Sequence, residues 1–230
     1  MPDLNIFASD LDNTLIHSYK TAKPGDVCVE MRNGKELSFM SKKAYSLLKK
    51  TSEKCLIIPV TTRSLEQYRR LDLGISFKYA VVAHGALFLE DGKNDERWKA
   101  DTHNLFNTPL PKIEESENLF DIRVVEDVFI FAKSKEPDSA ASLLEKTIDT
   151  SEFSVYAVYN KVYIFPKNFD KGTAVKRLER KLNAKVKICA GDSDLDTPML
   201  NIADIALTPR ISETDDLAYF VLSFVFNAFS

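Results

Sequence analysis

The feature that most constrains the fold of this chain is an alternation of short apolar runs with helical segments, which stops partway and later resumes. Residues 4–9, 55–62 and 79–85 are apolar runs typical of buried strands. Residues 41–52 and 64–74, which lie between them, have the apolar spacing of amphipathic helices. The order β-α-β-α-β predicts a parallel sheet with helices on its faces.

A different pattern occupies residues 86–168. Strands joined directly by hairpins, with a helix among them, are typical of an antiparallel sheet covered on one side. The predicted elements are, in order, a hairpin (86–100, turning at Asp91-Gly92), one or two strands (121–133), a helix (137–148) and an aromatic-rich hairpin (153–165, turning near Asn160).

The first pattern resumes at Lys171. It predicts a helix (171–183), a strand (186–191), a short helix (196–203), a strand (205–209) and a last helix that starts from the cap-like Ser212. We therefore predict an α/β protein with a Rossmann-like parallel-sheet core, made of residues 1–85 and 169–230. An α+β cap domain, residues 86–168, is inserted into it.

Acidic residues follow two of the predicted core strands. Asp10 and Asp12 come directly after the first strand, and Asp192, Asp194 and Asp196 come after the strand at 186–191. Ligands bind at the carboxyl ends of strands in open α/β sheets, so neighbouring strands would bring these carboxylates together. Crowded like charges favour a bound divalent cation, and a set of oxygen ligands favours Mg²⁺ over zinc.

Each acidic cluster on its own is equally well explained as a solvated turn or a helix cap. An EF-hand is excluded, because neither cluster has Gly at the sixth and Glu at the twelfth position of such a loop. Thr61 and Thr62, at the end of the second core strand, and Lys171, at the start of a helix, map to the same edge of the sheet. The order of acid pair, hydroxyl, lysine and second acid pair is hard to explain by chance.

This order of motifs resembles the haloacid dehalogenase superfamily of phosphohydrolases. Residues 10–14 ("DLDNT") match its first motif, Thr61 its second, Lys171 its third and residues 191–200 ("GDSDLDTPML") its fourth. An insertion between the second and third motifs is typical of the branch with a type-2 α/β cap, the Cof-like and sucrose-phosphatase-like group. The hairpin signal at 33–34 falls where the family carries a small flap.

The resemblance implies a role for each motif residue. Asp10 would be the nucleophile that forms an aspartyl phosphate, and Asp12 the general acid and base. Thr61, Thr62 and Lys171 would bind the phosphoryl oxygens. The ligands of Mg²⁺ would be Asp10, Asp12 through its backbone carbonyl and Asp192, with Asp196 in support, directly or through water.

Two positions depart from the usual motifs of this branch. Thr62 replaces a glycine in the second motif, and His84 replaces an asparagine before the cap. Neither change removes a catalytic group. His84, at the expected hinge between core and cap, and Lys167, just before the chain returns to the core, are candidates for contact with the substrate.

The predicted function is a Mg²⁺-dependent phosphatase, a phosphoric monoester hydrolase, for a small phosphorylated metabolite such as a sugar or polyol phosphate. The first alternative is a phosphotransferase or phosphomutase that passes the phosphoryl group to a sugar. The second is a non-enzymatic module that binds phosphate or metal, as a receiver domain does. A protein that binds metal and ligand but has lost its activity is a third.

Charge and composition exclude other classes of partner. The 230 residues carry a net charge of −3, so no nucleic-acid partner is expected. Three widely spaced cysteines match no disulfide or zinc pattern, the N-terminus lacks the basic region of a signal peptide, and no apolar run reaches the ~20 residues of a membrane span. A cytoplasmic protein, monomeric or weakly homo-oligomeric, is expected.

Overall fold

The computed structural model describes residues 4–106, 108–209 and 214–230. The core is a parallel sheet with the strand order β14-β13-β1-β5, in which β1 pairs with both β13 and β5. An isolated parallel bridge between Val60 and Val81 leads from β5 towards β6 (Tyr79–Val82). The four core strands are β1 (Ile6–Ser9), β5 (Leu56–Pro59), β13 (Val186–Ala190) and β14 (Ile205–Leu207).

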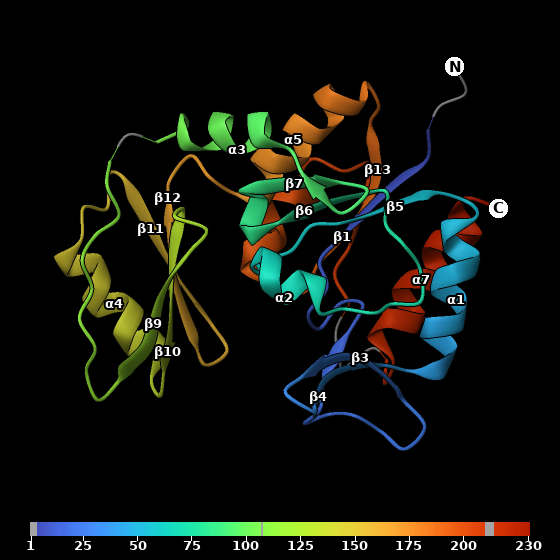
Figure 1. Cartoon of the computed structure of the whole chain (residues 1–230), viewed down its shortest axis with the longest axis horizontal. Helices are drawn as coiled ribbons and strands as arrows, with labels where there is room; N and C mark the ends of the chain where they lie inside the picture. The colour runs from blue at the N-terminus through green and yellow to red at the C-terminus, as the bar shows by residue number, and fades with distance from the viewer. Residues whose placement is uncertain (1–3, 107, 210–213) are drawn as a thin grey trace.

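Helices cover both faces of this sheet, which is why its strands are almost wholly apolar (Figure 1). Phe7 faces the pair of helices α1 and α7, while Ile6 and Ala8 face α5 and α6. The alternation along β1 thus divides the core into two apolar clusters. The helices are α1 (Lys42–Ser52), α2 (Leu65–Arg69), α5 (Lys171–Leu182), α6 (Thr197–Leu200) and α7 (Leu217–Ala228).

A small antiparallel sheet forms a flap beside the core. Its strands are β2 (His17–Ser18), β3 (Val27–Arg32) and β4 (Lys35–Met40), in the order β2-β4-β3. Asn33 and Gly34, between β3 and β4, have φ values of 51° and 75°. Positive φ at both positions is what a type I′ turn requires, so the predicted hairpin is present.

The segment after β6 differs in part from the prediction of a hairpin over 86–100. β7 (Leu87–Glu90) pairs with β6 and with the short β8 (Lys93–Asn94), but α3 (Glu96–His103) follows at once. The helix begins there because the Asp95 side chain accepts a hydrogen bond from the backbone N–H of Trp98, at 2.9 Å. Trp98 is buried among core residues that include Val60 and Val81.

The cap is an antiparallel sheet with the strand order β11-β12-β10-β9, to the left of the core in Figure 1. One face packs on α4 (Pro137–Thr147), and the other carries Phe129 and Phe165 against core residues such as Val82. The cap strands are β9 (Leu119–Val125), β10 (Phe129–Ser134), β11 (Phe153–Val158) and β12 (Lys161–Pro166).

The prediction of an α/β core with an α+β cap is thus confirmed, whereas the domain boundaries at 85/86 and 168/169 stay a prediction. The last helix starts from Asp216, whose side chain accepts from the N–H of Tyr219, and the predicted cap Ser212 lies outside the described residues. None of the described helices combines the length and the apolar character that crossing a membrane requires.

Candidate active site

The candidate site lies at the carboxyl ends of β1 and β13. These strands are neighbours, and the backbone N–H of Asp10 donates to the carbonyl of Ala190 at 2.9 Å. The pairing brings together three carboxylates, and Asp10, Asp192 and Asp196 each offer an oxygen within 4.8 Å of the others. Asp194 is exposed and is not part of this group.

Asp196 is held in place by the turn that follows β13. Its Oδ2 accepts from the backbone N–H of Ser193 at 3.0 Å and from the Ser193 hydroxyl at 2.8 Å. Gly191 leaves the space that this turn needs, because a Cβ there would lie 2.3 Å from the Cβ of Asp196. The spacing of Gly, Ser and Asp in the fourth motif is therefore a steric requirement of the turn.

Lys171, the first residue of α5, joins two of the acids. Its Nζ donates to Oδ1 of Asp10 at 2.6 Å and to Oδ1 of Asp196 at 2.5 Å, and the residue is almost fully buried. Burial alone would lower the pKa of Lys171, but the two carboxylates outweigh it and raise that pKa. Lys171 therefore remains an ammonium ion at neutral pH.

One lysine does not balance the charge of the acidic group. Burial raises the pKa of Asp10 well above its ordinary value; Lys171 opposes this, and Asp196, Asp12 and Asp192 add to it. The pKa of Asp192 is also raised, chiefly by burial. Three clustered carboxylates with excess negative charge and only oxygen donors fit a hard divalent cation such as Mg²⁺.

Asp12 lies apart from this group, and its carboxylate is bound by Arg63. Nε of Arg63 is 2.7 Å from Oδ2, and Nη2 is 2.8 Å from Oδ1. Burial alone would raise the pKa of Asp12, but the charge and hydrogen bonds of Arg63, helped by Lys161 and Lys171, lower it. The Asp12 side chain keeps 44% of its surface exposed, so a substrate can reach it.

The Arg63 guanidinium is itself fixed by the flap. Its Nη1 donates to Oε2 of Glu30, on β3, at 2.9 Å. The Glu30 side chain is only 3% exposed and also accepts from the Ser38 hydroxyl at 2.6 Å and from Nε of Arg70 at 3.1 Å. A buried network of charges thus connects the flap to Asp12. Neither Arg63 nor Glu30 was a predicted site residue, and the only signal was an arginine directly after Thr61-Thr62.

The two threonines lie at the end of β5, next to β1. Thr61 is fully buried, donates its N–H to the carbonyl of Val81 at 3.0 Å and accepts from the N–H of Arg63 at 3.2 Å. Thr62 is half-buried. Both therefore lie beside the acidic edge, but in different surroundings.

The cap reaches this edge through the turn between β11 and β12. Tyr159, in that turn with φ of 55°, donates its hydroxyl to Oδ2 of Asp192 at 2.7 Å. Lys161, two residues later, acts on Asp12 through its charge. Lys167 lies beyond the other end of β12, exposed to solvent, so the structure does not bring it together with the acids.

His84 lies between core and cap. It is buried, has φ of 60°, and stacks on Phe165 of β12 with the ring centroids 3.8 Å apart. Its Nδ1 has no hydrogen-bond partner among the described residues. Burial, and to a lesser degree the charge of Lys171, lower the pKa of His84 well below its ordinary value, so the ring is neutral.

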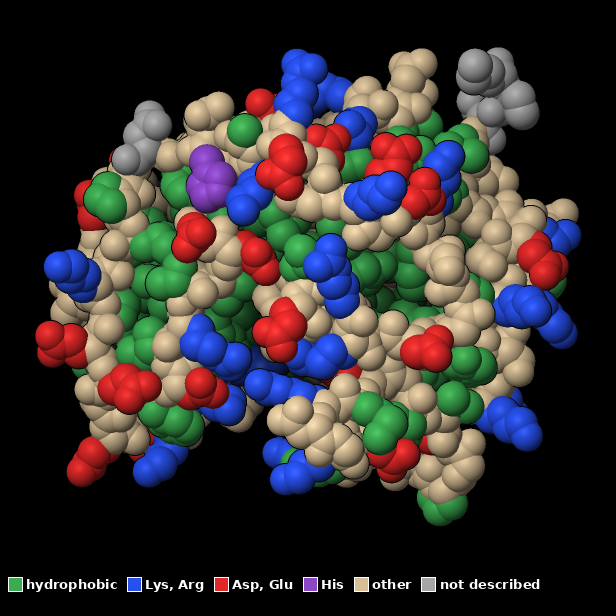
Figure 2. All heavy atoms as spheres, viewed as in Figure 1, with side chains coloured by type: hydrophobic (Ala, Val, Ile, Leu, Met, Phe, Trp, Pro, Cys, Tyr) green, Lys and Arg blue, Asp and Glu red, His purple; other side chains and the backbone are tan. Residues whose placement is uncertain are grey.

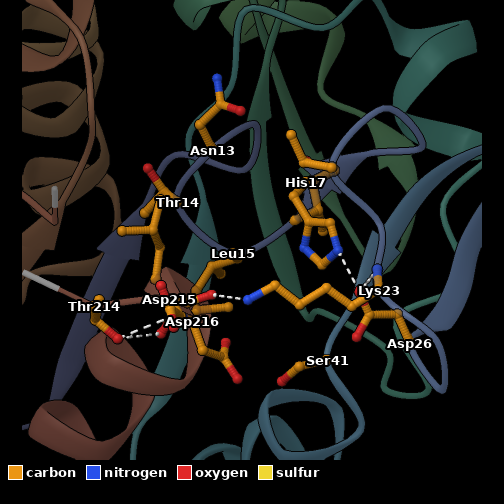
Figure 3. A pocket seen from close by; sticks show the side chains of 14 residues that line it. Asn13, Thr14, Leu15, His17, Lys23, Asp26, Ser41, Thr214, Asp215 and Asp216 are labelled. Atoms are coloured by element: carbon orange, nitrogen blue, oxygen red, sulfur yellow. Dashed lines mark hydrogen bonds and ion pairs between the residues drawn. The ribbon is translucent and has the colours of Figure 1, made fainter. Parts of the chain in front are cut away.

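A separate cavity of about 360 Å³ opens behind the loop that follows Asp12 (Figure 3). It lies between this loop and the start of α7, and Lys23 crosses it to the backbone carbonyl of Asp215 at 3.1 Å. Neither Asp10 nor Lys171 lines it. This cavity is therefore distinct from the acidic site.

Comparison with known proteins agrees with this geometry. The family model of the haloacid dehalogenase-like hydrolases matches residues 73–208, which is more than half of the chain. The chain therefore belongs to this family, and the prediction of a phosphohydrolase of the haloacid dehalogenase type is confirmed. A search among curated proteins finds no match to the sequence.

Solved structures share the whole fold at low sequence identity. The sucrose-phosphatase of Synechocystis sp. PCC6803, solved with sucrose and phosphate, has a TM-score of 0.65 and 15% identity over 98% of both chains. A putative HAD/COF-like hydrolase from Plasmodium vivax has a TM-score of 0.62 and 14% identity, covering 98% of this chain and 96% of the other. The C-terminal domain of C. albicans trehalose-6-phosphate phosphatase has 0.61 and 16%, covering 98% and 92%.

Proposed function

We propose that this protein is a Mg²⁺-dependent phosphatase that hydrolyses a small phosphorylated metabolite, such as a sugar or polyol phosphate, through an aspartyl phosphate on Asp10. The observation that carries the proposal is the bridge that Lys171 makes between Asp10 and Asp196, beside Asp192 and with Asp12 held apart. This arrangement offers a nucleophile, a separate proton carrier and a place for a cation.

In the first step, Oδ2 of Asp10, which Lys171 does not bind, attacks the phosphorus. A bond forms between Asp10 and phosphorus, the bond to the leaving oxygen breaks, and Asp12 gives that oxygen a proton. Lys171 and the Thr61 hydroxyl bind the oxygens of the phosphoryl group as its charge redistributes. Thr62 is the third candidate for this contact.

In the second step, water attacks the phosphorus and Asp12 takes a proton from it. The bond from phosphorus to Asp10 breaks, which restores the carboxylate and frees inorganic phosphate. The state of Asp12 in the structure suits this step, because a carboxylate held by Arg63 is the form that accepts a proton. The proton that Asp12 takes from water here is the one that it gives to the leaving oxygen in the next turnover.

The cation would bind Asp10, Asp192 and the backbone carbonyl of Asp12. Both oxygens of Asp196 already accept hydrogen bonds, Oδ1 from Lys171 and Oδ2 from Ser193. We therefore assign Asp196 a supporting role, through water or through Lys171. When bound, Mg²⁺ would offset the charge of the carboxylates and the phosphate, which lets one anion approach the other.

The cap supports a small substrate, because a sheet that closes on the site excludes macromolecules. We propose that residues 86–168 contain this cap and that β7, β8 and α3, which pack on the core, connect it to the catalytic domain. The folds shared with a sucrose-phosphatase and a trehalose-6-phosphate phosphatase support a sugar phosphate as the class.

The test is release of inorganic phosphate from a panel of sugar and polyol phosphates. We expect release with Mg²⁺, none with EDTA, and at least a thousandfold loss in Asp10→Asn, with an unchanged circular dichroism spectrum. Hydrolysis by Asp10→Asn, with deamidation excluded, would contradict the nucleophile. Transfer of the phosphoryl group to an added second sugar, whose phosphorylated product accumulates without release of inorganic phosphate, would favour the phosphotransferase instead.

A further inference from the structure

The core-facing side of the cap sheet ends in a group of basic residues. Lys133 on β10 lies directly opposite Lys161 on β12, and Arg123 on β9 lies opposite Phe131. Phe131 and Lys133 share one side of β10, so these residues belong to the same side of the sheet. Like charges in directly opposed positions destabilise an antiparallel pair of strands. The pairing of Lys133 with Lys161 therefore lowers stability, which points to a functional role for these lysines.

Acidic groups balance these cations only in part. Asp121 pairs with Lys133 at 2.8 Å and more loosely with Arg123 at 3.4 Å. Lys161 is half-buried and makes no ion pair within the described part of the chain. The basic group, defined here as Arg123, Lys133 and Lys161, therefore keeps an excess of positive charge.

This charge faces the site of reaction. The hydrogen bond from Tyr159 to Asp192 fixes the β11–β12 turn on the acidic edge, and Lys161 is the first residue of β12 after that turn. Figure 2 shows lysine and arginine side chains gathered in the hollow between cap and core, above the flap. Lys161 also acts on Asp12 through its charge, but both oxygens of that carboxylate are already bound by Arg63. The reacting phosphoryl group has Lys171 and a cation site, so Lys161 can bind another part of the substrate.

We propose that the alcohol part of the substrate carries a negative charge of its own, which Lys161 binds with Lys133 beside it. The inference rests on the proposed function and narrows it, from sugar and polyol phosphates in general to phosphomonoesters with a second anionic group. That group would be a carboxylate or a second phosphate. Either one would neutralise part of the excess positive charge of the basic group on the cap.

The experiment compares 3-phosphoglycerate with glycerol 3-phosphate, which differ in a terminal carboxylate against a neutral alcohol. We expect kcat/KM of the wild-type protein to favour 3-phosphoglycerate about tenfold, the effect of about one ion pair. In Lys161→Gln this ratio falls to about one, since the variant loses far more activity with the anionic probe. The control Lys146→Gln, an exposed lysine of α4, keeps the wild-type ratio.

Three results would overturn the inference. A wild-type protein that prefers glycerol 3-phosphate, or has no preference, would show that the cap does not bind the second charge. An equal loss with both probes in Lys161→Gln would place the effect of Lys161 at the transferred phosphate or at Asp12, not at a second anionic group. If neither probe nor p-nitrophenyl phosphate releases phosphate with Mg²⁺, the proposed phosphatase function is contradicted as well. If phosphate is released but without preference for the anionic probe, only the inference about the second charge fails.

Discussion

The Arg63 guanidinium holds both oxygens of the Asp12 carboxylate, with Nε 2.7 Å from Oδ2 and Nη2 2.8 Å from Oδ1. This planar, two-point contact fixes the direction of the carboxylate as well as its charge. The remaining nitrogen, Nη1, binds Glu30 of the flap. One side chain thus connects the proposed acid–base residue to the flap strand β3.

Replacement of Arg63 by lysine tests this positioning. Arg63→Lys keeps the positive charge but cannot make the two-point contact. We expect kcat to fall by about 10- to 100-fold, because a small misplacement of a catalytic group is costly, while KM changes less than threefold. Steady-state kinetics would measure both. The control is Arg69→Lys, an exposed arginine of α2, and a wild-type kcat in Arg63→Lys would refute the positioning role.

Replacement of Glu30 tests the buried end of the network. Glu30→Gln leaves Arg63 and Arg70 without their shared acid, and breaking such a pair costs about 3 kcal/mol of unfolding free energy at neutral pH. Urea unfolding of this variant and of Glu36→Gln, an exposed flap control, would measure the cost. Equal stability of the two variants would contradict it.

The same residue predicts a pH dependence. Burial opposes the shift, but Arg63, Ser38 and Arg70 together lower the pKa of Glu30 below its ordinary 4.5. A lowered carboxyl pKa gives stability that is present above 4.5 and is lost as the pH falls through the pKa of the folded state. The wild-type protein should therefore lose more stability than Glu30→Gln below pH 4.5. Parallel Tm curves for the two proteins would contradict this.

The core could be predicted from the sequence because its strands are buried on both faces and its helices are amphipathic, so each element has a local signal. The helix predicted over 64–74 fails for a non-local reason. α2 ends at Arg69 because the following chain pairs with the flap, where the N–H of Asp72 donates to the carbonyl of Val29 at 2.9 Å. The local sequence of residues 64–74 does not predict a contact with the distant flap strand.

The residues of the candidate site also fall into those that the sequence predicts and those that it does not. Asp10, Asp192 and Lys171 could be placed because each lies at the end of a predicted element, and the sheet brings those ends together. The contact of Arg63 with Asp12 joins residues 51 positions apart through side-chain direction alone. The spacing of residues along the sequence carries no information about side-chain direction. The network of Asp12, Arg63 and Glu30 therefore could not be predicted from the sequence.

Replacement of Lys171 tests the charge balance of the site. Lys171→Met leaves the buried Asp10 and Asp196 without their cation, so we expect a loss of about 3 to 5 kcal/mol in unfolding free energy at pH 7. A carboxyl whose pKa is raised destabilises the fold as the pH rises through that pKa. The deficit relative to the wild type should therefore shrink at acid pH and with added Mg²⁺.

Thermal unfolding of Lys171→Met across pH, with and without Mg²⁺, would measure this. The control is Lys176→Met, an exposed lysine of the same helix. A deficit that is independent of pH would mean that Lys171 acts through packing and not through its charge.

Gly191 offers a steric test of the fourth motif. A Cβ at this position would lie 2.3 Å from the Cβ and 2.9 Å from Oδ2 of Asp196, so Gly191→Ala must displace that carboxylate. Its bonds to Lys171 and Ser193 would then be lost together. We expect Mg²⁺ affinity to fall by at least tenfold and kcat by about a hundredfold, the order found when one preorganised donor is removed.

Isothermal titration with Mg²⁺ and phosphate-release kinetics would measure these two losses. Gly92→Ala is the control, because that glycine lies in the β7–β8 turn with φ of 75° and open space around it. The change strains the backbone there but displaces no side chain, and it lies away from the acidic site. Wild-type affinity and kcat in Gly191→Ala would show that the site works with Asp196 displaced. The assignment of Asp196 as the support of Lys171 would then be wrong.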